Sequence, residues 1–243
     1  MATFPIPILV YHQIAEAPPK GAPYRSLCVA PADFSRQMRF MRLLGYRGLS
    51  MGQLLPYLRG EKRGKVFGIT FDDGFENNLI YAAPVLQKLD FSSTCYAVSQ
   101  CLGQTNVWDQ SVGIAQVPLM TAAQLRQWVA SGQEVGAHTR HHVHLNALDP
   151  EASRLEIAQC KAELEAASTS PVLHFCYPYG EYGAEHAAIA RDAGYLTSTT
   201  TERSRCTQQE KMLELPRVPV VRRTSLFTLW LKVATAYEDR KRA

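Results

Sequence analysis

Short apolar runs alternate with helical segments along almost the whole chain, and this alternation is the feature that most limits how the chain can fold. A short apolar run bounded by turn residues is typical of a fully buried strand. Strands that alternate with helices indicate βα units and a mainly parallel sheet, either open or closed into a barrel. We therefore predict an α/β fold with strands at 6–11, 66–71, 93–98, 134–137, 172–177 and 195–199.

The predicted helices are recognised by apolar residues at helical spacing and by stop signals. Asp33 is the expected N-cap of the first helix, and Gly45 is its expected stop. Near the C-terminus, apolar residues of 226–233 recur at i, i+3, i+4 and i+7, which predicts a helix packed on the domain. The arginines and lysines around that helix leave a weak contact with a membrane surface as the alternative. Further helices are expected at 51–58, 80–89, 121–129, 150–167 and 184–192.

Length and composition favour one globular domain without a nucleic-acid partner. The 243 residues are 46% hydrophobic, and no linker or internal repeat divides them, so we predict a single domain over 1–243. The 26 Lys and Arg against 22 Asp and Glu give a net charge of +4, and no cluster is dense enough for nucleic-acid binding. The six cysteines form no CxxC pair, which predicts reduced thiols that fill the core.

The chain shows neither a membrane span nor a secretory signal. No apolar run is long enough for a transmembrane helix. Residues 1–3 lack the positive charge that opens a signal peptide, and the apolar run after them is too short. We therefore expect a cytoplasmic protein; a longer natural leader would instead predict a periplasmic or membrane-associated one.

Polar residues follow the ends of four predicted strands. His12 follows the first strand, Asp72 and Asp73 follow the second, and Tyr179 lies beyond another. The segment His138–His142 comes directly after a fourth. Because the carboxyl ends of parallel strands meet on one face of an α/β fold, these residues are expected to converge there.

The residue types at these strand ends suit a metal-dependent hydrolase. Two histidines with HxxxH spacing, His138 and His142, can reach one ion, and a third ligand would leave an open position of the kind zinc hydrolases use. Other divalent first-row metals accept the same ligands. Of the adjacent Asp72 and Asp73, one can be neutralised by the metal while the other accepts a proton from water, and Gly74 relaxes the backbone after them. The alternatives are a plain Asp-Asp-Gly turn and a solvated histidine loop.

Two segments together resemble the polysaccharide deacetylases, the NodB-homology group of carbohydrate esterases. They are TFDDG (Thr70–Gly74) and HTRHH (His138–His142), and the flanking GAHTRHHVHL keeps the small residues and the leucine of that family, with Val143 in place of a proline. FCYPYG (Phe175–Gly180) stands where the family has its third motif. The resemblance spans about 6–220 and implies a distorted (β/α) barrel with a metal at one mouth.

The resemblance also implies roles for individual residues. Asp73, His138 and His142 would bind the divalent metal, with zinc expected first and cobalt, nickel or ferrous iron as alternatives. Asp72 would be the general base that activates water. The backbone N–H of Tyr179 would help to hold the oxyanion.

Two departures from the family pattern concern the catalytic residues. Cys176 stands in place of the arginine that contacts the base, and no histidine follows His186 to act as the general acid. Circularly permuted members that act on poly-N-acetylglucosamine carry this acid in an N-terminal Tyr-His element, and the LVYHQI segment resembles it. His12 would then be the acid; the alternative is a hydrogen-bonded histidine at a strand end.

The expected function is hydrolysis of the acetamide of N-acetylated amino sugars in a glycan or a lipid-linked sugar. The alternatives are a sugar O-deacetylase, a catalytically silent glycan-binding protein and a purely structural metal site. Trp108 is expected either as a sugar platform at the mouth or as a core anchor. His141 is expected in solvent, His144 in loop packing, His174 in the core and His186 on a helix surface.

Overall fold

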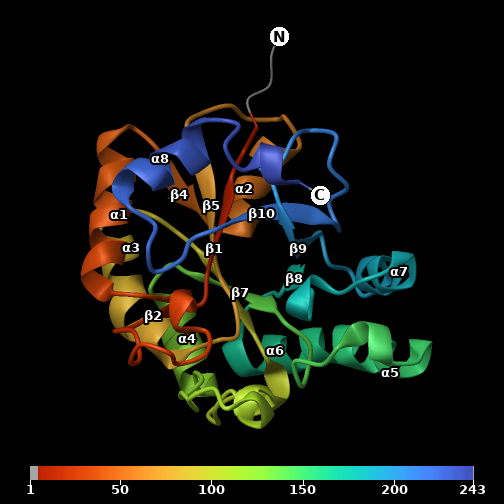
Figure 1. The fold of residues 1–243 in the computed structure, drawn as a ribbon. Helices are drawn as coiled ribbons and strands as arrows, with labels where there is room; N and C mark the ends of the chain where they lie inside the picture. Colours follow the sequence, from red (N-terminus) through yellow and green to blue (C-terminus); the bar gives the residue numbers. More distant parts are fainter. Residues whose placement is uncertain (1–4, 243) are drawn as a thin grey trace.

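The strands form a closed parallel barrel in the computed structural model, which describes residues 5–242 (Figure 1). Neighbouring strands pair in the order β1-β10-β9-β8-β7-β6-β5, and a direct β1–β5 pairing closes the ring. A further strand, β4 (Arg47–Leu49), pairs with the first half of β5. The barrel strands are β1 (Ile8–Tyr11), β5 (Val66–Phe71), β6 (Thr94–Ala97), β7 (Glu134–Ala137), β8 (His174–Cys176), β9 (Thr197–Arg203) and β10 (Leu215–Pro219).

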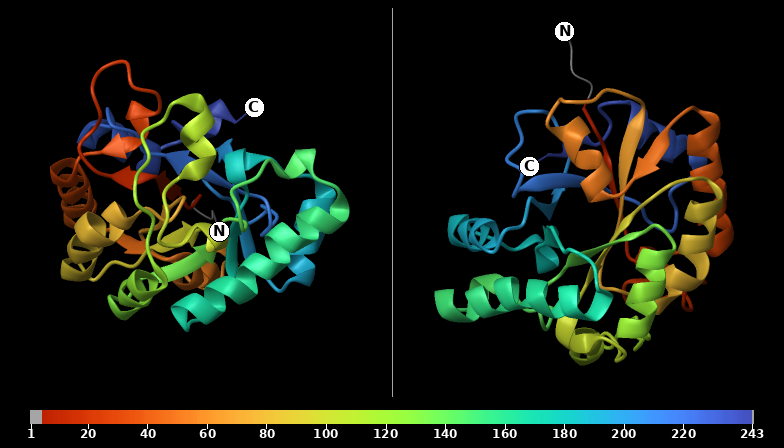
Figure 2. Two further views of the ribbon diagram at one scale, coloured as in Figure 1. Left: turned by 90° about the horizontal axis from the view of Figure 1, so that it is seen from below. Right: turned by 180° about the vertical axis from the view of Figure 1, so that it is seen from behind.

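Helices surround the strands (Figure 2), which confirms the predicted α/β barrel. A small pair, β2 (Gln13–Ile14) and β3 (Cys28–Val29), follows β1. Two π-helical segments, Asn78–Ala82 and Leu155–Gln159, continue directly into helices. The α-helices are α1 (Pro31–Leu43), α2 (Met51–Leu58), α3 (Ala83–Lys88), α4 (Ala122–Ala130), α5 (Pro150–Arg154), α6 (Cys160–Ser168), α7 (Ala184–Asp192) and α8 (Leu226–Ala234).

Alternation along β5 decides which side chains enter the barrel. Phe67, Ile69 and Phe71 point outward into the large core shared with the helices. The intervening positions point inward, where Thr70 donates a hydrogen bond to the Leu9 carbonyl at 2.8 Å. The next inward position after Thr70 is 72, so strand periodicity alone delivers an aspartate to the top of the barrel interior.

Several local predictions need correction. The first helix begins at Pro31 with Ala30 at its N-cap, so Asp33 lies in the first turn and is not the cap. Proline is well suited to the first helical position because its missing N–H would be unpaired there. His186 is 1% exposed and lies 3.3 Å from the Ser153 hydroxyl, so the prediction of a helix-surface histidine is also wrong.

Other expectations are confirmed. All six cysteines are buried and free. His174 is buried in β8, where its ring nitrogens lie 2.7 Å from the Thr197 hydroxyl and 3.0 Å from Glu134. Within residues 5–242 no helix has the length and apolarity needed to cross a bilayer. The expectation about residues 1–3 lies outside the described part of the chain.

We predict that Gly136→Ala destabilises the protein by about 1–3 kcal/mol, the usual result of overpacking a core. A Cβ at Gly136 would lie 2.4 Å from Tyr96 Cδ1 inside the barrel and 3.0 Å from the His174 carbonyl. Gly64→Ala is the matched control, because its Cβ would make an ordinary 3.5 Å contact with Tyr57. Urea unfolding of both variants measures the difference, and equal midpoints would contradict the packing described here.

Candidate active site

Three buried side chains converge beyond the carboxyl ends of β5 and β7. Asp73 Oδ1 lies 3.5 Å from His138 Nε2 and 3.4 Å from His142 Nε2. The three atoms that could bind a metal all lie within 4.8 Å of one another. One carboxylate and two imidazoles therefore face a common point, as the sequence predicted.

Left-handed backbone conformations orient the side chains of Asp73 and His142 toward the common point. Asp73 has φ 73° and Gly74 has φ 81°, which breaks strand alternation so that Asp72 and Asp73 both serve the same end of the barrel. Thr139 and His142 have φ 62° and 56° in the loop after β7. Such conformations are unfavourable for side chains with a Cβ, and their concentration around one point is typical of a functional site.

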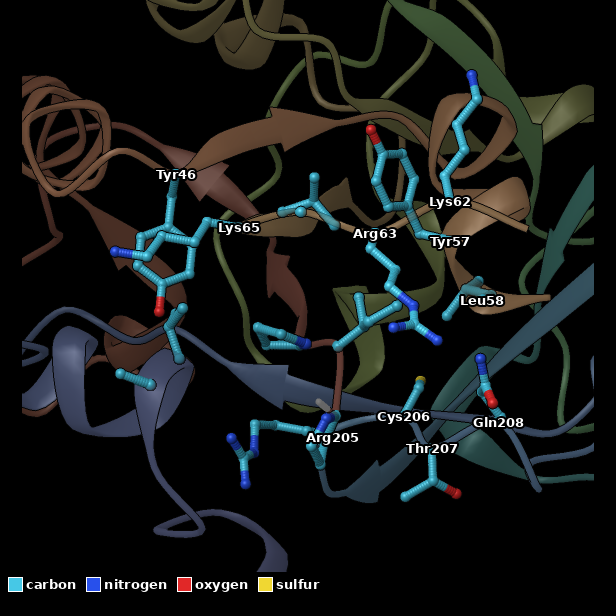
Figure 3. A pocket seen from close by; sticks show the side chains of 17 residues that line it. Tyr46, Tyr57, Leu58, Lys62, Arg63, Lys65, Arg205, Cys206, Thr207 and Gln208 are labelled. Atoms are coloured by element: carbon cyan, nitrogen blue, oxygen red, sulfur yellow. The ribbon is translucent and has the colours of Figure 1, made fainter. Parts of the chain in front are cut away.

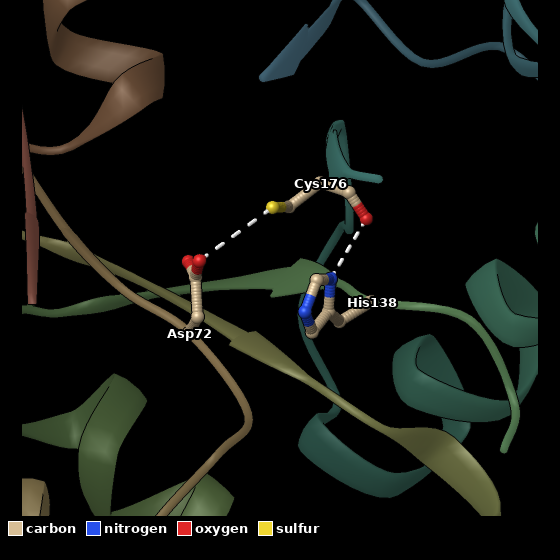
Figure 4. Close-up of side chains that lie close together, drawn as sticks. All are labelled: Asp72, His138 and Cys176. Carbon is tan, nitrogen blue, oxygen red and sulfur yellow. Dashed lines mark hydrogen bonds between the residues drawn. The ribbon is translucent and has the colours of Figure 1, made fainter. Parts of the chain in front are cut away.

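Each histidine is held from behind through its second ring nitrogen. His138 Nδ1 lies 2.8 Å from the Cys176 carbonyl (Figure 4). His142 Nδ1 lies 3.1 Å from the Tyr179 hydroxyl, and the Trp108 ring stacks on His142 with centroids 4.5 Å apart. A ring that carries its proton on Nδ1 presents the Nε2 lone pair to the common point, which is the form that binds a metal.

The charge states in this cluster are set by burial and by neighbours. Burial would raise the pKa of Asp73, but hydrogen bonds from His138 and His142 hold it well below its usual range. Burial lowers the pKa of His142, which favours the neutral ring. The pKa of His138 is raised despite burial by Cys176 and Asp73, so a cation that binds there displaces a proton.

Asp72 is bound by an arginine that sequence reasoning missed. Arg217 of β10 forms a two-pronged ion pair with it, Nη1 to Oδ1 at 2.7 Å and Nη2 to Oδ2 at 2.8 Å. Burial would raise the pKa of Asp72, and the Arg217 guanidinium more than offsets this, so the carboxylate is ionised. Arg217 also donates to Cys176 Sγ at 3.2 Å, and Cys176 Sγ lies 3.8 Å from Asp72 Oδ2 (Figure 4). Although Cys176 replaces the motif arginine, an arginine from another strand contacts Asp72.

His12 lies at the same end of the barrel, directly after β1. Its carbonyl accepts a hydrogen bond from Asn78 Nδ2 at 2.8 Å. The side chains of Asn77 and Asn78 also accept from the Ile14 amide, so the FENN segment after the paired aspartates fixes the loop that carries His12. The loop fixed in this way holds His12 at the end of the barrel where Asp72 and Asp73 follow β5.

The outer rim of the site is aromatic. Tyr179 is 40% exposed, with φ 59° in a 3₁₀ turn, and its hydroxyl contacts His142. His144 stacks on the Tyr179 ring with centroids 4.0 Å apart, and its Nδ1 lies 3.0 Å from Glu181. Trp108 meets both expectations in part, since its ring stacks on His142 and also packs against a buried apolar cluster that contains Phe75. His144 packs on the site. His141 is half exposed and pairs with Glu156 at 2.7 Å, which keeps it away from the common point.

Comparisons with known proteins agree with the geometry. The family model "Polysaccharide deacetylase" matches residues 59–198, more than half of the chain. YxkH of Bacillus subtilis, a relative named as a polysaccharide deacetylase, is 28% identical over 217 residues, covering 88% of this chain and 71% of YxkH. The Streptococcus pyogenes deacetylase PplD, solved with acetate, superposes with a TM-score of 0.83 at 25% identity, covering 96% of this chain and 99% of PplD. BC0361, a polysaccharide deacetylase from Bacillus cereus, superposes with a TM-score of 0.80 at 25% identity, covering 94% of this chain and 69% of BC0361.

We predict that Arg217→Met destabilises the protein by about 3–5 kcal/mol, because it leaves the Asp72 carboxylate buried without its partner. Adding Asp72→Asn removes that charge and is expected to restore most of the lost free energy of unfolding. Arg222→Met is the matched control, because Arg222 is exposed on the segment after β10. Urea unfolding of the wild type, Arg217→Met, Asp72→Asn, the double variant and the Arg222→Met control forms the test. Additive effects in the double variant would contradict a coupled pair.

Proposed function

The chain belongs to the polysaccharide deacetylase family of hydrolases, and from this premise we propose that it is a metal-dependent de-N-acetylase. Its substrates are N-acetylated amino sugars in a glycan or on a lipid carrier. The observation that carries the proposal is the convergence of Asp73, His138 and His142 on one point beside the ionised Asp72. The acetate found with the similar PplD is the product expected of such chemistry.

The donor set fits a divalent cation at Asp73, His138 and His142. Two imidazoles and a carboxylate are ligands zinc uses in hydrolases with one open position; cobalt, nickel and ferrous iron accept them too. A second cluster, Asp72 with His138 and Cys176, is also compact enough to hold an ion. Both Asp72 oxygens and the Cys176 sulfur already accept hydrogen bonds from Arg217, so the first cluster is the better site.

The side chains around this site supply the remaining groups for amide hydrolysis. A cation held by Asp73, His138 and His142 would polarise the acetyl carbonyl and lower the pKa of the attacking water. Asp72 takes the proton of the water, and the Arg217 ion pair keeps its carboxylate ionised and oriented for this role. The Tyr179 N–H donates to the oxyanion as the water oxygen bonds to the carbonyl carbon.

His12 is the proposed general acid. An amine leaves poorly without a proton, so the carbon–nitrogen bond breaks as His12 transfers its proton to the nitrogen, which yields acetate and a free amino sugar. Its place between β10 and β5, at the end of the strand that closes the barrel, supports this role. The relation to circularly permuted members stays a prediction.

Removal of the metal is expected to abolish acetate release while the fold is retained. Dialysis against a chelator, followed by zinc, should remove and restore activity on chitooligosaccharides or poly-N-acetylglucosamine fragments. Replacing a residue that only supports a metal ligand usually lowers activity by about 10–100-fold. Asp73 is a proposed direct ligand, so Asp73→Asn should reduce activity at least about 100-fold. Far-UV circular dichroism shows whether the fold is retained after chelation. Unfolding on chelation would indicate a purely structural metal, and sugar binding without acetate release would indicate a silent binding protein.

His12→Ala should affect amides far more than esters. We expect about 10²–10⁴-fold lower kcat on N-acetylated sugars, the usual contribution of a general acid. Hydrolysis of p-nitrophenyl acetate should change little, because nitrophenolate leaves without a proton. His141→Ala serves as the control, since His141 is half exposed and pairs with Glu156. Equal losses on both substrates would contradict the acid role, and activity on sugar esters alone would favour an O-deacetylase.

A further inference from the structure

A cavity of about 510 Å³ lies at the end of the barrel opposite the candidate active site (Figure 3). It is formed by residues that precede strands: Pro7 before β1, Tyr46 before β4 and Lys65 before β5. His12 and Asp72 follow the other ends of β1 and β5. The cavity is therefore separate from the proposed metal site, and its volume falls in the range of about 300–1,000 Å³ typical of small-molecule sites.

The lining combines an apolar floor with a cationic rim. Lys62, Arg63 and Lys65 belong to one exposed loop, and the Arg63 guanidinium extends into the cavity (Figure 3). Arg205 lies on the opposite wall, where Asp239 pairs with it at 2.7 Å. Among the described lining residues there is no aspartate or glutamate. The apolar floor is built by Ile6, Pro7, Leu58, Val66, Cys206 and Val233.

An exposed apolar track on α8 leads to the rim of this cavity. Val233 and Ala234, at the end of the helix, line the cavity. Phe227 and Trp230 are 67% and 36% exposed, and their rings stack with centroids 6.0 Å apart. Phe227, Trp230 and Ala234 are spaced i, i+3 and i+7, so they share one face of the helix.

We propose that this cavity binds an amphiphilic anion, with an acidic head group on the 62–65 loop and an apolar body on the floor beneath it. Cations on one wall favour phosphate, sulfonate or carboxylate, and the carbon-rich floor favours an alkyl chain or fused ring. Amino sugars, which are neutral or cationic, match neither half of this lining, so the site is no second substrate site. The proposal does not depend on the deacetylase activity.

Fluorescence titration with 1-anilinonaphthalene-8-sulfonate tests the proposal, with N-phenyl-1-naphthylamine as the uncharged analogue. Arg63→Glu/Lys65→Glu should weaken sulfonate binding about 10-fold or more, because two favourable charges are replaced by two repulsive ones, while binding of the neutral probe changes little. Arg59→Glu is the matched control, because Arg59 is exposed in the same segment but does not line the cavity. Ala234→Trp should block both probes, whereas Ala166→Trp, at an exposed position of α6, should block neither. Thermal melts show that each variant is folded.

Displacement experiments separate a free ligand from a membrane. Dodecyl phosphate below its micelle concentration should displace the sulfonate, and dodecyl maltoside should not. Equal sulfonate affinity in the wild type and in Arg63→Glu/Lys65→Glu would overturn the proposal. Binding seen only with phosphatidylglycerol vesicles would also overturn it, if that binding were lost in Phe227→Ser/Trp230→Ser but kept in the cavity variants. That result would show that the exposed face of α8 binds a bilayer.

Discussion

The ion pair between Asp72 and Arg217 is the interaction on which the candidate site depends. It joins β5 to β10 across the barrel interior, with both side chains nearly inaccessible to solvent. Both carboxylate oxygens and both terminal guanidinium nitrogens are used, so neither charge is left unpaired in a region of low dielectric. The pair keeps one aspartate ionised and fixed, while its neighbour Asp73 turns toward the two histidines.

That division between two adjacent aspartates relies on backbone strain. Four of the seven non-glycine residues with positive φ in the described chain lie at the site: Asp73, Thr139, His142 and Tyr179. Each left-handed residue costs about 1–2 kcal/mol, so the surrounding barrel must hold them. Hydrogen bonds do so directly, as when the Thr139 hydroxyl accepts from the His142 amide at 3.0 Å. The rigid parallel strands supply the rest of the support.

Much of this arrangement could be predicted from sequence because it is carried by local patterns. Polar residues follow the buried strands, and the ends of parallel strands share one face of the fold. These two facts were enough to predict that Asp72, Asp73, His138 and His142 lie close together. Arg217 could not be predicted in the same way, because its partner lies 145 positions away in the chain. A lone arginine within the apolar segment LPRVPV was the available signal. The Tyr179 side chain behind His142 likewise depends on tertiary geometry.

Anomalous diffraction at the zinc edge, from crystals grown with zinc, tests the central claim most directly. The account predicts one peak about 2.0–2.2 Å from Asp73 Oδ1, His138 Nε2 and His142 Nε2, the usual zinc distances to oxygen and imidazole ligands. In that structure Asp72 should remain paired with Arg217 and should not bind the ion. A peak on Asp72 and Cys176, or no peak at the end of the barrel where His12 lies, would contradict it.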